Sequence, residues 1–418
     1  MRPWCVVVAA LSLLCGAPQA DWPRWMGPLG NGHVPANVPV PKTLPAEPRV
    51  LWTAPLGYGN GSPAVSAQKV FVLDNRDGKE VAAAFGLADG REIWRVPLDD
   101  LWADSGSPAG PRGTPTVDGD RVYVQSCRGE LRCLRTADGG QLWRVSFVRD
   151  FGAAELQEAG DIPGARRHGN TASPLVDGGR LYVMVGGSPN ASVVCFNKLT
   201  GAVIWKSQDD IPGHAGPIWA TLGGLRQLVC FMAEAVIGLD PSDGKLLWRA
   251  PVKTQLGRHV ATPVIVGDTV VVGSYTSGLI GIRVTRQGDA FRAEEVWRDR
   301  SLGVNFSSPV AIGGFVYGLG PGNRLFCVEA RTGKRVWVEE SFFSGTLDAG
   351  FASFLVMGQN LLVLAERGRL SLVAPTAAGC KVLGQMTVCE RNWCSPAYVG
   401  GKLIVRDNGS LRCLQLAP

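Results

Sequence analysis

The chain has 418 residues, of which 54 are Gly and 28 are Pro, while only 19% are charged and 45% are apolar. Average proteins contain about 7% Gly, about 5% Pro and about 25% charged residues, so this composition excludes a coiled coil, and the apolar content excludes a disordered chain. The net charge of +6 comes without a basic run, which argues against a nucleic-acid partner. A turn-rich, mostly β protein with a large core remains.

Residues 1–20 form a separate segment. Arg2 precedes the apolar run 6–14, and small residues follow up to Ala20. The run is shorter than the ~20 residues that a membrane-spanning helix needs, and no later stretch is long and apolar enough to span. The pattern is typical of a cleaved signal peptide and predicts a secreted or periplasmic protein. Cys15 leaves a lipoprotein open, but Leu14 stands where a small residue is needed, so we favour plain secretion.

Residues 21–48 contain seven Pro. This density leaves no room for a helix and predicts an extended arm. Trp22 and Trp25 are expected to anchor the arm on the folded domain, and exposure to a partner is the alternative.

From residue 49 onward one pattern recurs along the chain. It consists of Ser/Thr-Pro, an apolar strand, a Gly/Asp turn, two further strands, and an Asp/Thr-Gly turn before a strand that contains Trp. The clearest copy begins at Thr114 and closes at Trp143. The eight copies, the seventh of them degenerate, begin at Ser62, Thr114, Ser173, Gly216, Thr262, Ser308, Ala352 and Ser395.

The closing Trp residues set the period of the repeat. Trp52 and Trp337 are separated by six intervals of about 47 residues, which fits a four-stranded propeller blade. We expect these Trp residues to pack between neighbouring blades, because a binding site would not need the same slot in nearly every copy. Leu383 fills the slot in the degenerate copy. The closing Trp residues are Trp52, Trp94, Trp143, Trp205, Trp248, Trp297 and Trp337.

The last copy ends without a closing strand of its own. Residues 49–52, ahead of the first copy, have the form of that strand. The N-terminal strand is therefore predicted to complete the last blade, which removes the open sheet edge. The sequence predicts an all-β, eight-bladed propeller of four-stranded antiparallel blades over residues 49–418.

These repeats resemble those of the pyrroloquinoline quinone (PQQ)-like β-propellers, the quinoprotein alcohol dehydrogenase-like superfamily. Residues 21–28, DWPRWMGP, also resemble the start of secreted bacterial members. The resemblance covers nearly all of residues 21–418 and is specific for the fold rather than for an activity. The family includes PQQ-dependent dehydrogenases, the BamB-type outer-membrane assembly scaffold and propellers without an assigned role.

Nine cysteines remain after removal of the signal segment. Cys389 and Cys394 bracket one loop, so a local disulfide and two free thiols are both open there. Four others occupy the same small-residue slot of different copies, too far apart to bond or to share a metal, and are expected to be buried. These four are Cys133, Cys195, Cys327 and Cys413.

The loops ahead of the eight first strands should converge on one face and form a funnel. Three of the four His residues fall in these loops, together with Arg and Asn. Arg suits planar carboxylates, such as a tricarboxylate quinone or an acidic glycan. The alternative is that these side chains tie irregular loops together. The candidate funnel residues are Arg112, Arg167, His168, Asn170, His214, Arg258, His259, Asn305, Arg391 and Asn392.

Cofactor binding is a second possibility for the funnel. The resemblance implies PQQ and Ca²⁺ as possible cofactors. Asn170 or Asn305 would supply oxygen ligands to such a cation, and Asp348 is the one carboxylate candidate for a base or ligand.

Three functions compete at this point. The first is a non-catalytic secreted or periplasmic scaffold, expected to be monomeric, that binds an envelope or secreted protein or a small carboxylate or glycan. The second is a PQQ- and Ca²⁺-dependent dehydrogenase of small alcohols or sugars, and the third is a carbohydrate-binding cell-surface propeller. The resemblance implies that a PQQ alcohol dehydrogenase carries two adjacent cysteines beside its cofactor, and this chain has none. It also has no haem-type Cys-x-x-Cys-His, a modest length and a single funnel carboxylate, which favours the first function over the second. Motifs of the common hydrolases are absent as well.

Overall fold

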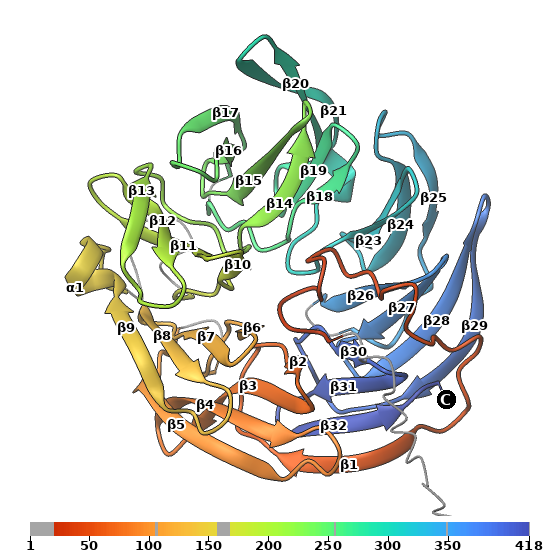
Figure 1. Cartoon of the computed structure of the whole chain (residues 1–418). Helices are drawn as coiled ribbons and strands as arrows, with labels where there is room; N and C mark the ends of the chain where they lie inside the picture. The colour runs from red at the N-terminus through yellow and green to blue at the C-terminus, as the bar shows by residue number, and fades with distance from the viewer. Residues whose placement is uncertain (1–20, 105–107, 157–167, 255, 348–349, 418) are drawn as a thin grey trace, which may run out of the picture.

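The computed structural model describes residues 21–104, 108–156, 168–254, 256–347 and 350–417. The expected signal segment 1–20 lies outside these ranges. Eight four-stranded antiparallel sheets stand around a central axis, which confirms the predicted eight-bladed propeller (Figure 1). We number the blades 1 to 8 in chain order.

In blades 1 to 7 the strands run from the axis outward in chain order. Blade 1 consists of β2 (Ala64–Ser66), β3 (Lys69–Arg76), β4 (Lys79–Gly86) and β5 (Glu92–Asp100), and blade 2 of β6 (Thr116–Asp118), β7 (Arg121–Gln125), β8 (Glu130–Arg135) and β9 (Gln141–Ser146). Blade 3 consists of β10 (Leu175–Asp177), β11 (Arg180–Gly187), β12 (Ala191–Asn197) and β13 (Val203–Ser207). Blade 4 consists of β14 (Ile218–Leu222), β15 (Leu225–Phe231), β16 (Ala235–Leu239) and β17 (Leu246–Pro251). Blade 5 consists of β18 (Val264–Val266), β19 (Thr269–Ser274), β20 (Gly278–Gln287) and β21 (Ala290–Asp299). Blade 6 consists of β22 (Val310–Ile312), β23 (Phe315–Gly320), β24 (Arg324–Glu329) and β25 (Arg335–Glu339). Blade 7 consists of β26 (Ala352–Met357), β27 (Asn360–Ala365), β28 (Arg369–Thr376) and β29 (Gly379–Thr387).

Blade 8 combines both ends of the propeller sequence. It contains β30 (Ala397–Val399), β31 (Lys402–Arg406) and β32 (Ser410–Gln415), and its outer strand is β1 (Arg49–Pro55). β1 pairs antiparallel with β32, and Thr53 lies opposite Arg412. The predicted closure by the N-terminal strand is therefore confirmed.

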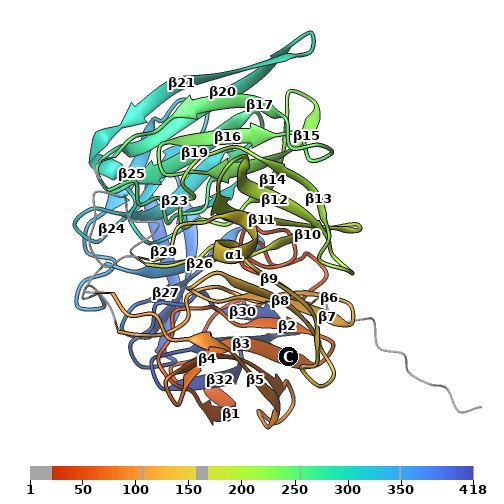
Figure 2. The same cartoon turned by 90° about the vertical axis from the view of Figure 1, so that its left-hand side faces the viewer.

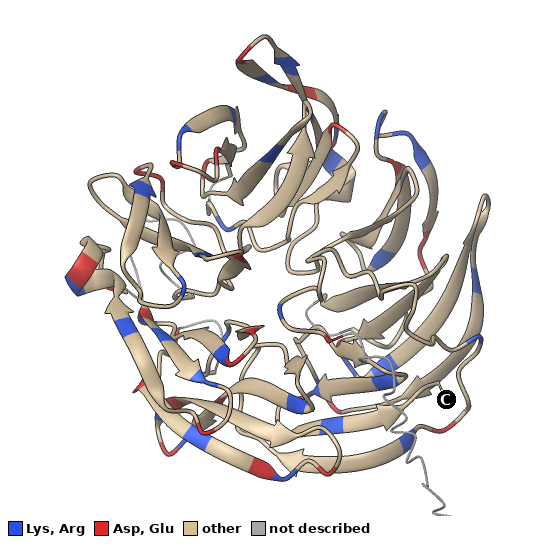
Figure 3. Ribbon diagram, in the orientation of Figure 1, with Lys and Arg blue, Asp and Glu red and all other residues tan. Residues whose placement is uncertain are grey.

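Two short helices interrupt the strands. They are α1 (Phe147–Phe151) and the 3₁₀ turn η1 (Arg300–Leu302), and within the described ranges no helix has the length and apolarity needed to cross a bilayer. The long β20–β21 hairpin projects beyond the ring (Figure 2). Basic and acidic residues are interspersed over the blades (Figure 3), in keeping with the absence of a basic run in the sequence.

The Ser/Thr of the repeat joins neighbouring blades around the axis. The amide of Ser62 donates to Oγ1 of Thr114 in blade 2 (3.1 Å), and the amide of Thr114 donates to Oγ of Ser173 in blade 3 (3.1 Å). The amide of Ser395 in blade 8 donates to Oγ of Ser62 (2.8 Å), so the same bond also links the last blade to the first. Gly216 occupies the same slot in blade 4 and offers no hydroxyl. The hydroxyl slot of the repeat is thus an acceptor between blades.

The closing Trp faces a small residue on the third strand of its own blade. Trp143 lies opposite Cys133, and Trp248 lies opposite Gly238. A Cβ on Gly238 would stand 2.1 Å from Nε1 of Trp248, so the indole leaves space for a small side chain only. This packing accounts for the recurrent small slot, and its four cysteines are free thiols buried beside an indole.

Six of the seven indoles also reach the next blade. Nε1 of Trp94 donates to the carbonyl of Thr136 (3.1 Å), and Nε1 of Trp205 donates to the carbonyl of Pro241 (3.1 Å). Trp248 instead donates to Oε1 of Gln227 in its own blade (2.6 Å). The others that cross to the next blade are Trp52, Trp143, Trp297 and Trp337.

Blade 7 replaces the indole with part of the arm. Leu383 was expected to fill the Trp slot, but this prediction is wrong, because Gly384 lies opposite Leu372 at that register. A Cβ on Gly384 would stand 2.6 Å from the backbone nitrogen of Leu44. The arm therefore packs against the position that an indole fills in the other blades.

The arm crosses the ring before it enters β1. Trp22 is 2% exposed and pairs with Val65 of blade 1, so it is an anchor as expected. Farther along, His33 pairs with Val356 of blade 7. The red segment in Figure 1 runs from the central axis outward over blade 7. These contacts place the arm across the inner ends of the blades.

Candidate functional site

An axial cavity of about 570 Å³ lies where the loops ahead of the first strands converge. Five of the predicted funnel residues line it. Arg112 precedes β6, His168 precedes β10, His214 precedes β14, Arg258 precedes β18 and Arg391 precedes β30. The loop ahead of each inner strand ends at the axis, which is why residues so distant in sequence meet.

A buried carboxylate holds two of these side chains. Oδ2 of Asp104 lies 3.0 Å from Nη2 of Arg112 and 2.8 Å from Nδ1 of His168, and its side chain is fully buried. Arg112 also donates to the carbonyl of His168 (2.8 Å). Burial lowers the pKa of His168, although its contact with Asp104 opposes this shift.

Blades 4 and 5 continue this polar side. Nδ1 of His214 lies 2.9 Å from Oγ1 of Thr171, and the His168 and His214 ring centroids are 5.4 Å apart. Arg258 donates to Oδ1 of Asn305 (3.2 Å). Asn305 therefore positions an arginine of the cavity, although it is not itself a lining residue.

The opposite side of the cavity is aromatic, which the sequence reasoning missed. Phe351 and Trp393 stack with centroids 5.4 Å apart, and Phe306 lies 4.9 Å from Trp393. The guanidinium of Arg258 lies 4.9 Å from the centroid of the Phe306 ring, a cation–π contact. Tyr58 also lines the cavity. These residues occupy the same loops, just ahead of the inner strands, so a search for aromatic side chains there would have found them.

A second buried carboxylate lies behind this aromatic side. Oε1 of Glu366 accepts from Nε of Arg391 (3.0 Å) and from Nε1 of Trp393 (3.0 Å), and the Glu366 side chain is fully buried. The carboxylate fixes both side chains in place. No carboxylate is among the described residues that line the cavity.

Trp25 of the arm closes the cavity at one end. Its Nε1 donates to Oγ1 of Thr262 (2.9 Å). Trp25 also lines a smaller cavity of about 150 Å³ together with Arg24 and His33 of the arm. Trp25 of the arm therefore lies between the two cavities on the axis. Trp25 was expected to anchor the arm, with exposure to a partner as the alternative, and it also forms part of the wall of the candidate site.

His259 is not in the cavity, which corrects its assignment to the funnel. Its side chain is fully buried, its Nε2 lies 3.0 Å from the carbonyl oxygen of Ala233, and its ring stacks on Phe231 at 4.1 Å. Burial lowers the pKa of His259 to about 4. This imidazole is a neutral packing group.

Asn170 and Asn392 also tie loops together rather than line the cavity. Nδ2 of Asn170 donates to the carbonyl of Cys127 (2.9 Å). Nδ2 of Asn392 donates to the carbonyl of Ala365 (3.1 Å), and Asn392 is fully buried. Arg167 and Asp348 lie outside the described residues.

The disulfide considered between Cys389 and Cys394 is not formed. Both are free thiols. Nδ2 of Asn392 donates to Sγ of Cys389 (3.5 Å), while Sγ of Cys394 donates to the carbonyl of Gly59 (3.7 Å). Each sulfur has a polar partner of its own, within the same loop for Cys389 and ahead of β2 for Cys394.

Comparison with known proteins places the chain in a family. A family model described as "Outer membrane protein assembly factor BamB" matches residues 45–162 and 77–339. The chain belongs to this family of PQQ-like propellers. The outer membrane protein assembly factor BamB of Moranella endobia (strain PCIT) is 22% identical over 396 residues, 88% of this chain and 90% of that protein.

Two solved structures share the fold. BamB from Moraxella catarrhalis has a TM-score of 0.61 at 14% identity, over 88% of this chain and 97% of that one. The quinohemoprotein alcohol dehydrogenase from Comamonas testosteroni has a TM-score of 0.67 at 12% identity, over 96% of this chain and 81% of that one. At these identities the likeness concerns the fold alone.

The donor chemistry of the cavity does not fit a Ca²⁺–quinone centre. Ca²⁺ takes six to eight oxygen ligands, often from carboxylates. The described wall offers guanidinium groups, imidazoles, hydroxyls, rings and the amides of Asn60 and Asn408 but no carboxylate, and no cluster of metal-binding His, Cys, Asp or Glu occurs among the described residues. Asn305 directs its oxygen to Arg258, and Asn170 directs its amide nitrogen to a loop carbonyl. We derive no reaction step through such a centre.

A buried acid near the cavity was not foreseen, since no motif marks its place in β4. Glu80 is fully buried, and the amide of Cys127 donates to its Oε2 (3.0 Å). Burial raises the pKa of Glu80 to about 7, although the bond from Cys127 opposes the shift. Near neutral pH this carboxyl lies at the midpoint of its titration.

Glu80→Gln is expected to remove a pH dependence of stability. Because the pKa of Glu80 is higher in the folded chain than in the unfolded chain, the folded state is favoured below pH ~4.5, and this advantage is lost as pH rises through about 7. The raised pKa corresponds to a loss of about 3 kcal/mol in the free energy of unfolding over this pH range. Urea unfolding at several pH values between 5 and 8 measures how steeply that free energy falls with pH. Glutamine retains an acceptor for the Cys127 amide, so the variant should show a flatter profile and higher stability at pH 8. A profile as steep as that of the wild type would contradict this role.

Proposed function

We propose that the chain is a secreted or periplasmic assembly scaffold. It binds a partner through the face that carries the axial cavity and does not catalyse a reaction. Relatives over most of its length are named outer membrane protein assembly factors. An envelope protein is therefore the proposed partner, and the envelope the proposed location.

The observation that carries the proposal is the way the cavity holds its cations. Arg112 forms an ion pair with Asp104, and Arg391 forms one with Glu366. Both carboxylates are fully buried behind the wall of the cavity. Side chains fixed by buried partners lose little entropy when a ligand arrives. Preorganised guanidinium groups of this kind favour recognition of an anionic group on the partner.

The shape of the cavity adds to this argument. Trp25 lies between the larger and the smaller cavity, so a group inserted into the larger one would not continue along the axis, which favours a chain end or a projecting group of the partner. A volume of about 570 Å³ is within the range of ligand pockets, about 300–1,000 Å³.

Photo-crosslinking in the organism that encodes the chain tests the proposal. A photoreactive residue in place of Asn408, which lines the cavity, should capture an envelope protein. Arg258→Gln should reduce the yield about tenfold, as expected when a hydrogen bond from a charged donor is lost. Arg226→Gln is the matched control, because Arg226 pairs with Asp177 away from the cavity.

Two results would overturn the scaffold proposal. The first is an unchanged crosslinking yield in Arg258→Gln. The second is dye reduction by the purified protein with added PQQ and Ca²⁺ and a panel of alcohols and aldoses, which would indicate a dehydrogenase instead.

A further inference from the structure

We propose that the axial cavity binds the terminal sugar acid of an acidic glycan, a saccharide ring that carries a carboxylate. This inference rests on the proposed binding function and names the ligand of the same site. It follows from the division of the cavity wall into a polar and an aromatic side.

The polar side comes from the loops ahead of blades 2 to 5, which supply Arg112, His168, His214 and Arg258. The aromatic side comes from the loops ahead of blades 6 to 8, which supply Phe306, Phe351 and Trp393, and the last of these loops adds one further guanidinium, that of Arg391. A ligand that fills both sides needs an anionic edge and an apolar face on one small body. A sugar acid has both, because its carboxylate projects from a ring whose C–H faces are apolar.

Arginine accounts for recognition of the carboxylate. The planar guanidinium fork matches the two oxygens of a carboxylate, and the pair is stronger than neutral hydrogen bonds. Arg258 is directed by Asn305 on one side and by the Phe306 ring on the other, so its fork is held at the junction of the polar and aromatic sides. A carboxylate bound there would place the attached ring against Phe306.

Hydroxyl donors in the wall favour a sugar over a plain aromatic acid. Oγ1 of Thr114 and Oγ of Ser173 each accept a backbone amide hydrogen from the neighbouring blade. A hydroxyl that accepts retains its own proton and can donate it to a ligand oxygen. Both side chains line the cavity. An aromatic acid has no ring hydroxyls to receive these protons.

Trp25 limits which part of a glycan can enter. It lies between the larger and the smaller cavity and is held there by Thr262, so a polysaccharide would not continue along the axis from one cavity into the other, which favours its terminal residue. A free sugar acid and a chain end share this chemistry, and the experiment separates them.

Calorimetric titration of the full chain with matched probes tests the inference. Galacturonic acid and galactose differ only at the carboxylate, so galacturonic acid should bind about tenfold or more tightly, the factor expected for a charged hydrogen bond. Benzoate should bind more weakly than galacturonic acid. A trigalacturonate that binds more tightly than the monomer identifies a chain end as the source, and equal affinity identifies the free acid.

Variants connect the binding to the cavity. Arg258→Gln should weaken galacturonate about tenfold and leave galactose unchanged, because only the carboxylate contact is lost. Phe306→Leu should weaken both sugars, since the apolar face contacts the ring in both. Arg226→Gln should leave both affinities unchanged, and circular dichroism melting establishes that each variant is folded.

The proposal is overturned if galacturonate and galactose bind equally, if benzoate binds more tightly than galacturonate, or if no probe binds the folded wild type. In any of these cases, photo-crosslinks that still depend on Arg258 would leave the scaffold function standing with a different ligand. Crosslinks that do not depend on Arg258, together with specific galacturonate binding, would remove the scaffold function and retain the sugar acid.

Discussion

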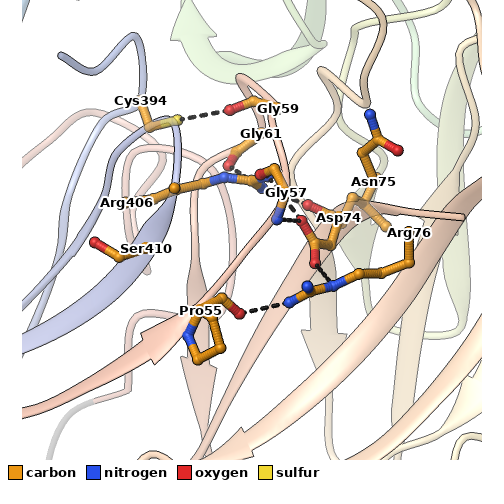
Figure 4. A network of polar contacts seen from close by, with 12 residues as sticks. Pro55, Gly57, Gly59, Gly61, Asp74, Asn75, Arg76, Cys394, Arg406 and Ser410 are labelled. Carbon is orange, nitrogen blue, oxygen red and sulfur yellow. Dashed lines mark hydrogen bonds and ion pairs between the residues drawn. The ribbon is translucent and has the colours of Figure 1, made fainter. Parts of the chain in front are cut away.

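Arg406→Met is expected to lower the free energy of unfolding by about 3–5 kcal/mol, as when one partner of a buried ion pair is removed. The Arg406 side chain is fully buried in β31 of blade 8. Its guanidinium donates to the carbonyls of Gly57 (3.1 Å), Gly61 (3.3 Å) and Leu73 and lies 3.4 Å from Oδ1 of Asp74 (Figure 4).

The position of this network makes the loss large. Arg406 belongs to the last blade, while Leu73 and Asp74 belong to β3 of blade 1, so the guanidinium joins the two ends of the propeller sequence. Methionine fills similar space but donates nothing. Asp74, 1% exposed, would keep only Arg76 (2.7 Å) and the amide of Gly57 (2.8 Å) as partners. Buried carbonyls without donors add to the cost.

A matched substitution acts on the same carboxylate from its other side. Arg76 pairs with Oδ2 of Asp74, but its side chain is 26% exposed. Arg76 is partly solvated and a glutamine amide can still donate a hydrogen bond from this side, so Arg76→Gln should cost less than Arg406→Met, about 1 kcal/mol. Guanidinium chloride unfolding of both variants gives the comparison. If both variants lose the same free energy of unfolding, the burial of Arg406 between blades 8 and 1 does not make its loss more costly, and the prediction is wrong.

The repeated part of the fold could be predicted because each copy shows the same local chemistry. Thr114 accepts an amide from the previous blade and Trp143 lies opposite the small Cys133, and the same slots recur around the ring. Repetition makes such a signal visible in one sequence. Leu383 was misplaced by one residue because a bulge lies between Leu372 and Val373 and shifts the register.

The candidate site was predicted only in part, because it depends on residues that do not repeat. The polar loop residues were evident, but position in a loop does not distinguish a side chain that faces the axis from one that points away. His259 stacks on Phe231, whereas Arg258 beside it faces the cavity. The buried carboxylates Asp104 and Glu366 have no motif, since only the fold brings them to their arginines.

Trp205→Ala is expected to destabilise the propeller by about 3–5 kcal/mol, as large-to-small substitutions of core aromatics do. Trp205 is 8% exposed and packs in one cluster with Leu228 and Ile237 of blade 4. A Cβ added to Gly244, at the turn of blade 4, would stand 2.6 Å from the indole ring. The side chain thus fills the seam between blades 3 and 4, and alanine would leave a cavity there.

Trp205→Phe separates packing from hydrogen bonding at this seam. Phenylalanine retains most of the ring but loses the bond from Nε1 to the carbonyl of Pro241 (3.1 Å). That oxygen still accepts from the hydroxyl of Tyr182 (3.3 Å), so it is not left without a donor. The loss should be about 1 kcal/mol, the net value of one hydrogen bond. Urea midpoints of wild type, Phe and Ala variants measure both steps. If Trp205→Phe costs as much as Trp205→Ala, the hydrogen bond rather than the buried ring joins these blades; if neither shifts the midpoint, the repeated indole has no packing role.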